Sequence, residues 1–181
     1  MIVSMALFGA AIGSFFAGIL SDYYGRKSVI MVADVMFTLG SIIMGYAQTI
    51  NMLIIGRVIV GLGVGIAAQI VPLYLAEISP QEIRGMMISF NVAMITIGQL
   101  LSCIFVYYIR PNWRLMLGLA AVPSVLQFIG MISMPESPRW LGKMGEMKAS
   151  RRVMAQIYKQ EYIFDANEEL EMEIENLKIE T

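Results

Sequence analysis

The chain has 181 residues, of which 57% are hydrophobic and only 15% are charged, and its formal net charge is −1. Water-soluble domains carry about 25% charged residues, so this composition excludes an ordinary soluble domain. A nucleic-acid-binding protein needs a basic cluster, and the chain has none, so nucleic acid is excluded as a partner.

Groups that carry enzyme chemistry are scarce. The chain has no histidine, and its single cysteine, Cys103, lies in an apolar run where it serves best as a small packing residue. Metal-dependent and nucleophilic catalysis both need clusters that include such residues. We therefore expect no enzyme activity, no metal and no cofactor.

The charges divide the chain into two parts. Residues 1–134 hold 10 charged residues, and residues 135–181 hold 17. Within the first part, five apolar stretches are long enough to cross a bilayer core of about 30 Å at about 1.5 Å per residue: 1–21, 29–47, 52–76, 85–109 and 115–134. The first lacks a basic leader and a cleavage pattern, which favours a membrane helix over a signal peptide. We predict an all-α membrane protein with five transmembrane helices, followed by a helical segment at 135–181.

The lysine and arginine residues predict how these helices are oriented. Ten fall in the turns 22–27 and 77–84 and in the C-terminal tail, whereas the opposite turns hold only Arg110 and Arg114. Basic loops stay in the cytoplasm, so we expect these two turns and the tail to be cytoplasmic. Met1 would then start outside, and we expect a further helix upstream of it.

Small residues recur at helical spacing in two of the stretches. Gly9, Gly13 and Ala17 lie in the first, and Gly61 and Gly65 lie in the third. In lipid, such rows let helix backbones approach closely, so we expect these helices to pack against one another or against an absent partner.

Four motifs resemble one transporter family. The turn Gly18-Ile-Leu-Ser-Asp-Tyr-Tyr-Gly-Arg-Lys27 resembles the signature loop of the major facilitator superfamily, with Tyr23 in place of the usual basic residue. Arg57-x-x-x-Gly61, the run 72–80 with Arg84-Gly85, and Pro-Glu-Ser-Pro-Arg-Trp-Leu at 135–141 are similar to sugar porter motifs in order and spacing. The resemblance implies helices two to six of a partial N-terminal bundle, with the first helix and the C-terminal half of the transporter as missing partners.

The resemblance also suggests a substrate. The segments 1–7, 33–35, 95–99 and 113–118 look most like proton-coupled myo-inositol transporters. Val92 stands where glucose and xylose porters usually have a sugar-binding glutamine. The function implied is proton/myo-inositol symport by alternating access at the plasma membrane or a vacuolar or other internal membrane. The alternatives are a hexose or pentose porter, and a non-transporting fragment with a structural or regulatory role.

The fourth apolar stretch carries the candidate substrate contacts. Ser89, Val92, Thr96, Gln99 and Cys103 share one helical face, and Asn91 lies beside it. Membrane transporters bind substrate near the midplane through a few polar groups, and an amide both donates to and accepts from hydroxyls. We predict that Gln99, Thr96 and Asn91 bind the polyol or sugar. The alternative is that they only hydrogen-bond to neighbouring helices.

Arg57 is the candidate for proton coupling. A cation inside an apolar span costs at least about 2.5 kcal/mol unless it finds a partner or water, and no acid lies close to it in sequence. The resemblance implies an aspartate on helix one, upstream of Met1, as its proton-sensitive partner. The alternative is an arginine that extends to the membrane surface.

The cytoplasmic turns carry a candidate gate. The resemblance implies salt bridges that break and reform during transport, made by Asp22, Arg26, Glu77, Arg84, Glu136 and Arg139. The alternative is a solvated set of charges that only fixes topology.

The tail has two amphipathic patterns. Val153, Met154, Ile157 and Tyr158 share one helical face, and Leu170, Ile174 and Leu177 share another. The family uses such cytoplasmic helices as a latch between its two halves, and a plain solvated tail is the alternative.

Overall fold

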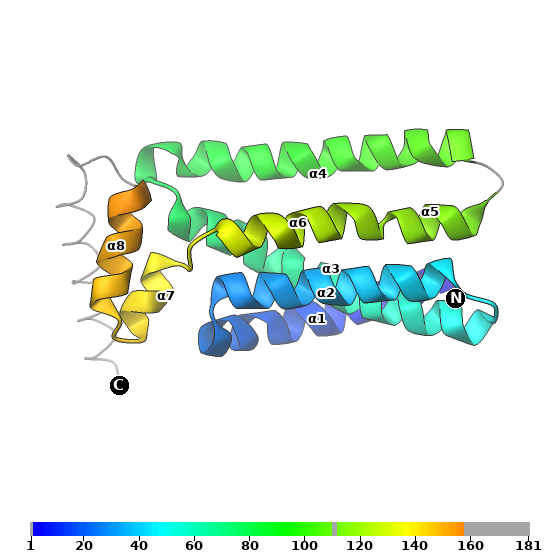
Figure 1. The fold of residues 1–181 in the computed structure, drawn as a ribbon, viewed down its shortest axis with the longest axis horizontal. Coiled ribbons are helices and arrows are strands. Elements are labelled where there is room, and N and C mark those ends of the chain that lie inside the picture. Colours follow the sequence, from blue (N-terminus) through cyan, green and yellow to red (C-terminus); the bar gives the residue numbers. More distant parts are fainter. Residues whose placement is uncertain (1, 110–111, 158–181) are drawn as a thin grey trace.

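The computed structural model describes residues 2–109 and 112–157, and these residues form eight helices (Figure 1). The long ones are α1 (Ile2–Tyr24), α2 (Arg26–Gly45), α3 (Ile50–Ile78) and α4 (Gln81–Ile109). The shorter ones are α5 (Trp113–Leu119), α6 (Ala121–Ser133), α7 (Pro138–Lys143) and α8 (Met147–Ile157). Five stretches are long and apolar enough to cross a membrane: α1, α2, α3, α4, and α5 together with α6. The all-α fold with five candidate membrane helices is confirmed.

Helices α1 and α3 form the most extensive contact, and it depends on glycine. A Cβ added to Gly65 would overlap the carbonyl oxygen of Ala10, and one added to Gly61 would overlap that of Ala6. From the other side, a Cβ on Gly9 would meet the carbonyl oxygen of Val58. The small-residue rows of the two helices therefore pack against each other, backbone on backbone.

Helix α2 joins this pair to α5 and α6. Its Ala33 backbone passes so close to α3 that a Cβ on Gly63 would lie 2.8 Å from the Ala33 carbonyl oxygen. Gly45 and Gly118 bring α2 against α5, where a Cβ on Gly45 would lie 3.1 Å from the Gly118 Cα. The buried core lies where the first three helices meet and consists of Ala17, Val29, Ile30, Ala33, Ile66, Ile70 and Tyr74.

The fifth membrane stretch is broken at Ala120, between α5 and α6. Pro123 lies in the first turn of α6, lacks an N–H, and its ring crowds the carbonyl four residues earlier, at Leu119. The apolar stretch expected over 115–134 corresponds to one candidate membrane span, Arg114–Ser133, which consists of these two helices. The other four helices differ from the expected stretches by up to four residues at each end, because α2 and α4 take charged residues into their first turns.

Helix α4 stands apart from the bundle (Figure 1). None of its described side chains is buried, and its contacts with the bundle are few. Large apolar residues such as Phe90, Ile95 and Leu100 are each at least 60% exposed. A helix with exposed apolar surface on every side is suited to lipid or to a further protein helix.

The glycine contact can be tested with Gly65→Leu. The added side chain would force α1 and α3 apart, and overpacking of this kind costs about 1–3 kcal/mol. We expect a fall of roughly 5 °C or more in the thermal midpoint of the chain in detergent, measured by the loss of its size-exclusion peak. Gly18→Leu is the matched control, because nothing lies within 4 Å of a Cβ on Gly18. Equal destabilisation by both variants would contradict the assignment.

Candidate functional site

The turn between α1 and α2 receives the carboxylate of Glu136. Gly25 ends the turn with φ at +90°, a conformation that favours glycine. A Cβ there would lie 2.5 Å from Glu136 Oε2. Glu136 Oε1 accepts hydrogen bonds from the Lys27 N–H at 2.9 Å and the Ser137 N–H at 3.0 Å. A negative charge at the first turn of α2 is stabilised by the helix dipole, so Glu136 fixes the start of that helix.

Arg26 is the centre of a buried charge cluster. It is 8% exposed, and its Nη1 lies 3.2 Å from both Asp22 Oδ1 and the Ser21 carbonyl oxygen. Its Nε lies 3.0 Å from Glu77 Oε2 without a directed hydrogen bond, so that contact is an ion pair only. The Ser137 hydroxyl donates to the same Glu77 oxygen. A buried guanidinium with two carboxylates joins α1, α2 and α3 at one end of the bundle.

The segment after α6 closes over this cluster. The Tyr74 hydroxyl donates to the Pro135 carbonyl oxygen at 2.7 Å, and Trp140 Nε1 donates to the Asp22 carbonyl oxygen at 3.0 Å. Lys143 Nζ lies 3.7 Å from Asp22 Oδ2, in an exposed pair. Helix α7 is thereby fixed to the ends of α1 and α3.

The structure brings together four of the six candidate gate residues: Asp22, Arg26, Glu77 and Glu136. Arg139 is half-buried and interacts with another group, and Arg84 is half-buried, with no acceptor for its Nε–H among the described residues. Ser137, Tyr74 and Trp140 also belong to this site but were not among the predicted gate residues. Ser137 and Trp140 stand in the same motif as Glu136, so the motif itself was the signal.

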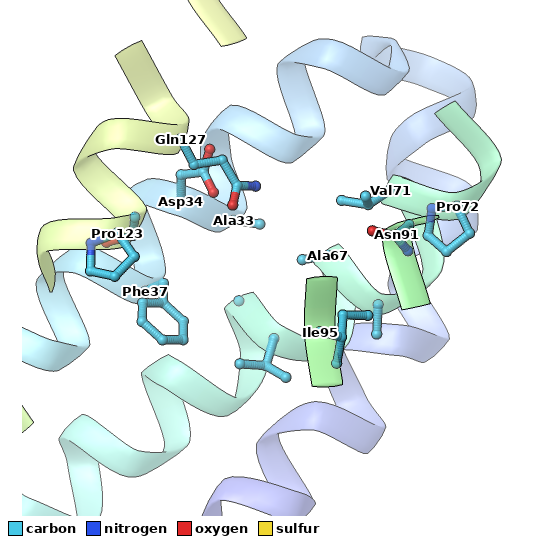
Figure 2. A pocket seen from close by; sticks show the side chains of 14 residues that line it. Ala33, Asp34, Phe37, Ala67, Val71, Pro72, Asn91, Ile95, Pro123 and Gln127 are labelled. Atoms are coloured by element: carbon cyan, nitrogen blue, oxygen red, sulfur yellow. The ribbon is translucent and has the colours of Figure 1, made fainter. Parts of the chain in front are cut away.

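A second feature is a groove between the bundle and α4. It has a volume of about 450 Å³, is lined mainly by apolar side chains, and is bordered by α2, α3, α4 and α6 (Figure 2). Its polar lining residues are Asp34, Asn91, Ser124 and Gln127. Among the described residues, no group of histidine, cysteine, aspartate or glutamate is arranged to hold a metal.

Of the predicted substrate contacts, Asn91 alone lines this groove. Thr96 is exposed, and its hydroxyl donates to the carbonyl oxygen of Val92 on its own helix at 3.0 Å. Gln99 is also exposed on α4. The three residues therefore lie along one helix without being joined into one site by the described part of the chain.

Arg57 lies on α3, half-buried, and its Nε has no hydrogen-bond partner among the described residues. Arg114, in contrast, donates from Nε to the Ala47 carbonyl oxygen at 3.2 Å and closes the end of α2.

The second amphipathic pattern of the tail, Leu170, Ile174 and Leu177, lies outside the described residues. In the first pattern, Met154 is buried, Val153 and Ile157 are half-buried, and Tyr158 lies outside the described residues.

Comparison with known proteins gives consistent results. The family described as "Sugar (and other) transporter" matches residues 1–181. The "Probable inositol transporter 2" of Arabidopsis thaliana is 44% identical over 98% of this chain and 30% of its own length. The human "Proton myo-inositol cotransporter" is 41% identical over 87% of this chain and 25% of its own length.

The fold also matches a solved transporter. The major facilitator superfamily proton:xylose symporter XylE of E. coli superposes with a TM-score of 0.90 at 28% identity, over 97% of this chain and 43% of the symporter. This chain thus spans about a third or less of the two curated relatives. The family comprises transporters rather than enzymes, and the match covers every described helix. The chain therefore belongs to the sugar transporter family of the major facilitator superfamily, whose members are multi-pass integral membrane proteins.

Proposed function

We propose that this chain forms part of a proton-coupled transporter of myo-inositol. The observation that carries the proposal is the identity of 44% with an inositol transporter across 98% of the chain. The fold of a proton:xylose symporter supports the same class of small polyhydroxylated substrate. Because the chain spans 30% of that relative, transport requires further helices that the described residues do not supply.

The exposed face of α4 is the proposed substrate surface. A polyol presents several hydroxyls, and the amides of Gln99 and Asn91 each offer both a donor and an acceptor. Thr96 adds a hydroxyl between them on the same helix. The exposure of Gln99 and Thr96 supports this assignment, since neither side chain is used in packing against the described bundle.

Arg57 is the proposed coupling residue. An arginine inside an apolar helix favours a counter-charge, and none of the described carboxylates pairs with it. A protonatable acid on a neighbouring helix would attract Arg57 when ionised and release it when protonated. That difference in attraction would link proton binding to the conformation of the bundle.

Asp22, Arg26, Glu77 and Glu136 together form the proposed gate. We place this cluster on the cytoplasmic side of the membrane, with the tail. Breaking a buried pair by removing one partner costs about 3–5 kcal/mol, enough to bias two conformations of a transporter. Arg84 and Arg139 are proposed as further members of this network, and a second helical half of the transporter is proposed to rock against this one.

Substrate contact can be tested by replacing the matching segment of Arabidopsis inositol transporter 2 with this chain. The chimaera should take up radiolabelled myo-inositol, and excess glucose should compete poorly. Gln99→Ala should raise KM roughly tenfold. A hydrogen bond between uncharged groups stabilises a complex by about 0.5–1.5 kcal/mol, and a buried substrate hydroxyl left without a partner adds a further penalty. Leu101→Ala is the control, since two residues along a helix point to the opposite face. Equal KM values for the two variants, or strong competition by glucose, would contradict the assignment.

The gate can be tested in the same chimaera with Glu77→Gln. The amide keeps the shape of the carboxyl group but removes its charge, so the cytoplasmic side should open more readily. We expect roughly fivefold faster thiol labelling of a cysteine placed at that side, which corresponds to about 1 kcal/mol. The exposed Glu82, changed to Gln, is the control. Unchanged labelling in Glu77→Gln would remove Glu77 from the gate.

A further inference from the structure

Asp34 is a buried acid that the proposed transport cycle does not use. It lies in α2, eight residues or about 12 Å from Arg26 along the helix axis. Asp34 is 5% exposed, and its Oδ2 has no hydrogen-bond partner among the described residues. A carboxylate buried in an apolar surrounding without a partner is costly, and such groups become neutral instead.

The helices packed around Asp34 bring no positive charge to it. The groove that it lines has apolar or uncharged residues from α3, α4 and α6. The nearest ionisable groups on its own helix are Arg26 and Lys27, at the start of α2. Arg26 pairs with Asp22 and Glu77, and Lys27 donates a hydrogen bond to the Ile132 carbonyl oxygen.

The other elements place their ionisable groups towards the helix ends or at another level. In α3, Arg57 is six residues, or about 9 Å, from Gly63, which packs against Ala33. The remaining groups on α1, α3, α4 and α5 are Asp22, Tyr23 and Tyr24 on α1, Tyr74 and Glu77 on α3, Glu82, Arg84, Cys103, Tyr107 and Tyr108 on α4, and Arg114 on α5. Helix α6 carries none.

The register of α2 against α6 places a polar partner opposite Asp34. The two helices run antiparallel, because Lys27 Nζ contacts the Ile132 carbonyl oxygen at 2.9 Å and the Thr38 and Ser124 hydroxyls lie 2.7 Å apart. Asp34 lies one turn before Thr38, and Gln127 lies one turn after Ser124. Both therefore fall at the same level, and Figure 2 shows them on the same side of the cavity, with Asn91 and Ile95 across it.

We propose that Asp34 is a proton-binding site inside the membrane, in which the protonated carboxyl group donates a hydrogen bond to the side-chain oxygen of Gln127. Thr38 and Ser124 hold α2 and α6 in the register that this pair needs. Thr38 also donates to the Asp34 carbonyl oxygen at 2.8 Å, which orients its hydroxyl between the two helices. The site takes a proton alone and does not depend on whether the chain transports a polyol.

The test is infrared spectroscopy of the full chain in lipid bilayers at pH 7.5. A protonated carboxyl group gives a C=O stretching band that shifts in deuterated water, whereas a carboxylate does not. We expect this band in the unchanged chain, its loss in Asp34→Asn, and a shift to higher frequency in Gln127→Leu, where the hydrogen bond is absent. Glu146→Gln is the control and should leave the band unchanged, because Glu146 is exposed and lies outside the membrane helices.

Three outcomes would overturn the proposal. The first is the absence of a protonated-carboxyl band at pH 7.5, and the second is a band that Asp34→Asn leaves in place. The third is failure of Asp34→Asn to fold while Glu146→Gln folds, since asparagine has the shape and neutrality of the protonated acid and should be accepted. A band that Gln127→Leu does not move would remove Gln127 as the partner.

Discussion

A bilayer interior offers no water, so each polar group in this bundle must find its partner within protein or remain neutral. The glycine contacts between α1 and α3 satisfy that constraint in the simplest way, because helices whose backbones touch need few polar side chains to hold them. The polar residues that do occur within the membrane helices are therefore informative. Asp34 and Arg57 each have a buried side-chain atom without a hydrogen-bond partner among the described residues.

In the charge cluster at the α7 end of the bundle, by contrast, nearly every polar group has an ion-pair or hydrogen-bond partner. Glu136 closes the start of α2, Lys27 closes the end of α6, and Arg26 joins two carboxylates. These contacts connect the α1–α2 turn with the α6–α7 turn, more than 100 residues apart in sequence. One end of the bundle is thus fixed by ion pairs and helix capping, while the membrane region beside α4 has an open groove.

The sequence predicted much of this fold because membrane helices leave strong signals. Uncharged stretches of about 20 residues marked the five spans, and glycine rows marked the α1–α3 contact. The break at Ala120 was missed because Pro123 lies inside an otherwise apolar run, where prolines are tolerated. Motifs identified Asp22, Arg26, Glu77 and Glu136, but the partners Ser137 and Tyr74 depend on how α7 docks, which spacing alone does not give. Asp34 was visible as a charge in a span, yet its place opposite Gln127 follows only from the helix register.

The central claim is that this bundle serves proton-coupled transport of a polyol. The most direct measurement records myo-inositol uptake and internal pH together in liposomes that contain the chimaera with this chain. Coupled transport predicts that adding myo-inositol outside acidifies the interior in step with uptake, and that Arg57→Ala abolishes the pH change. Uptake without acidification, or acidification that Arg57→Ala leaves unchanged, would contradict the claim.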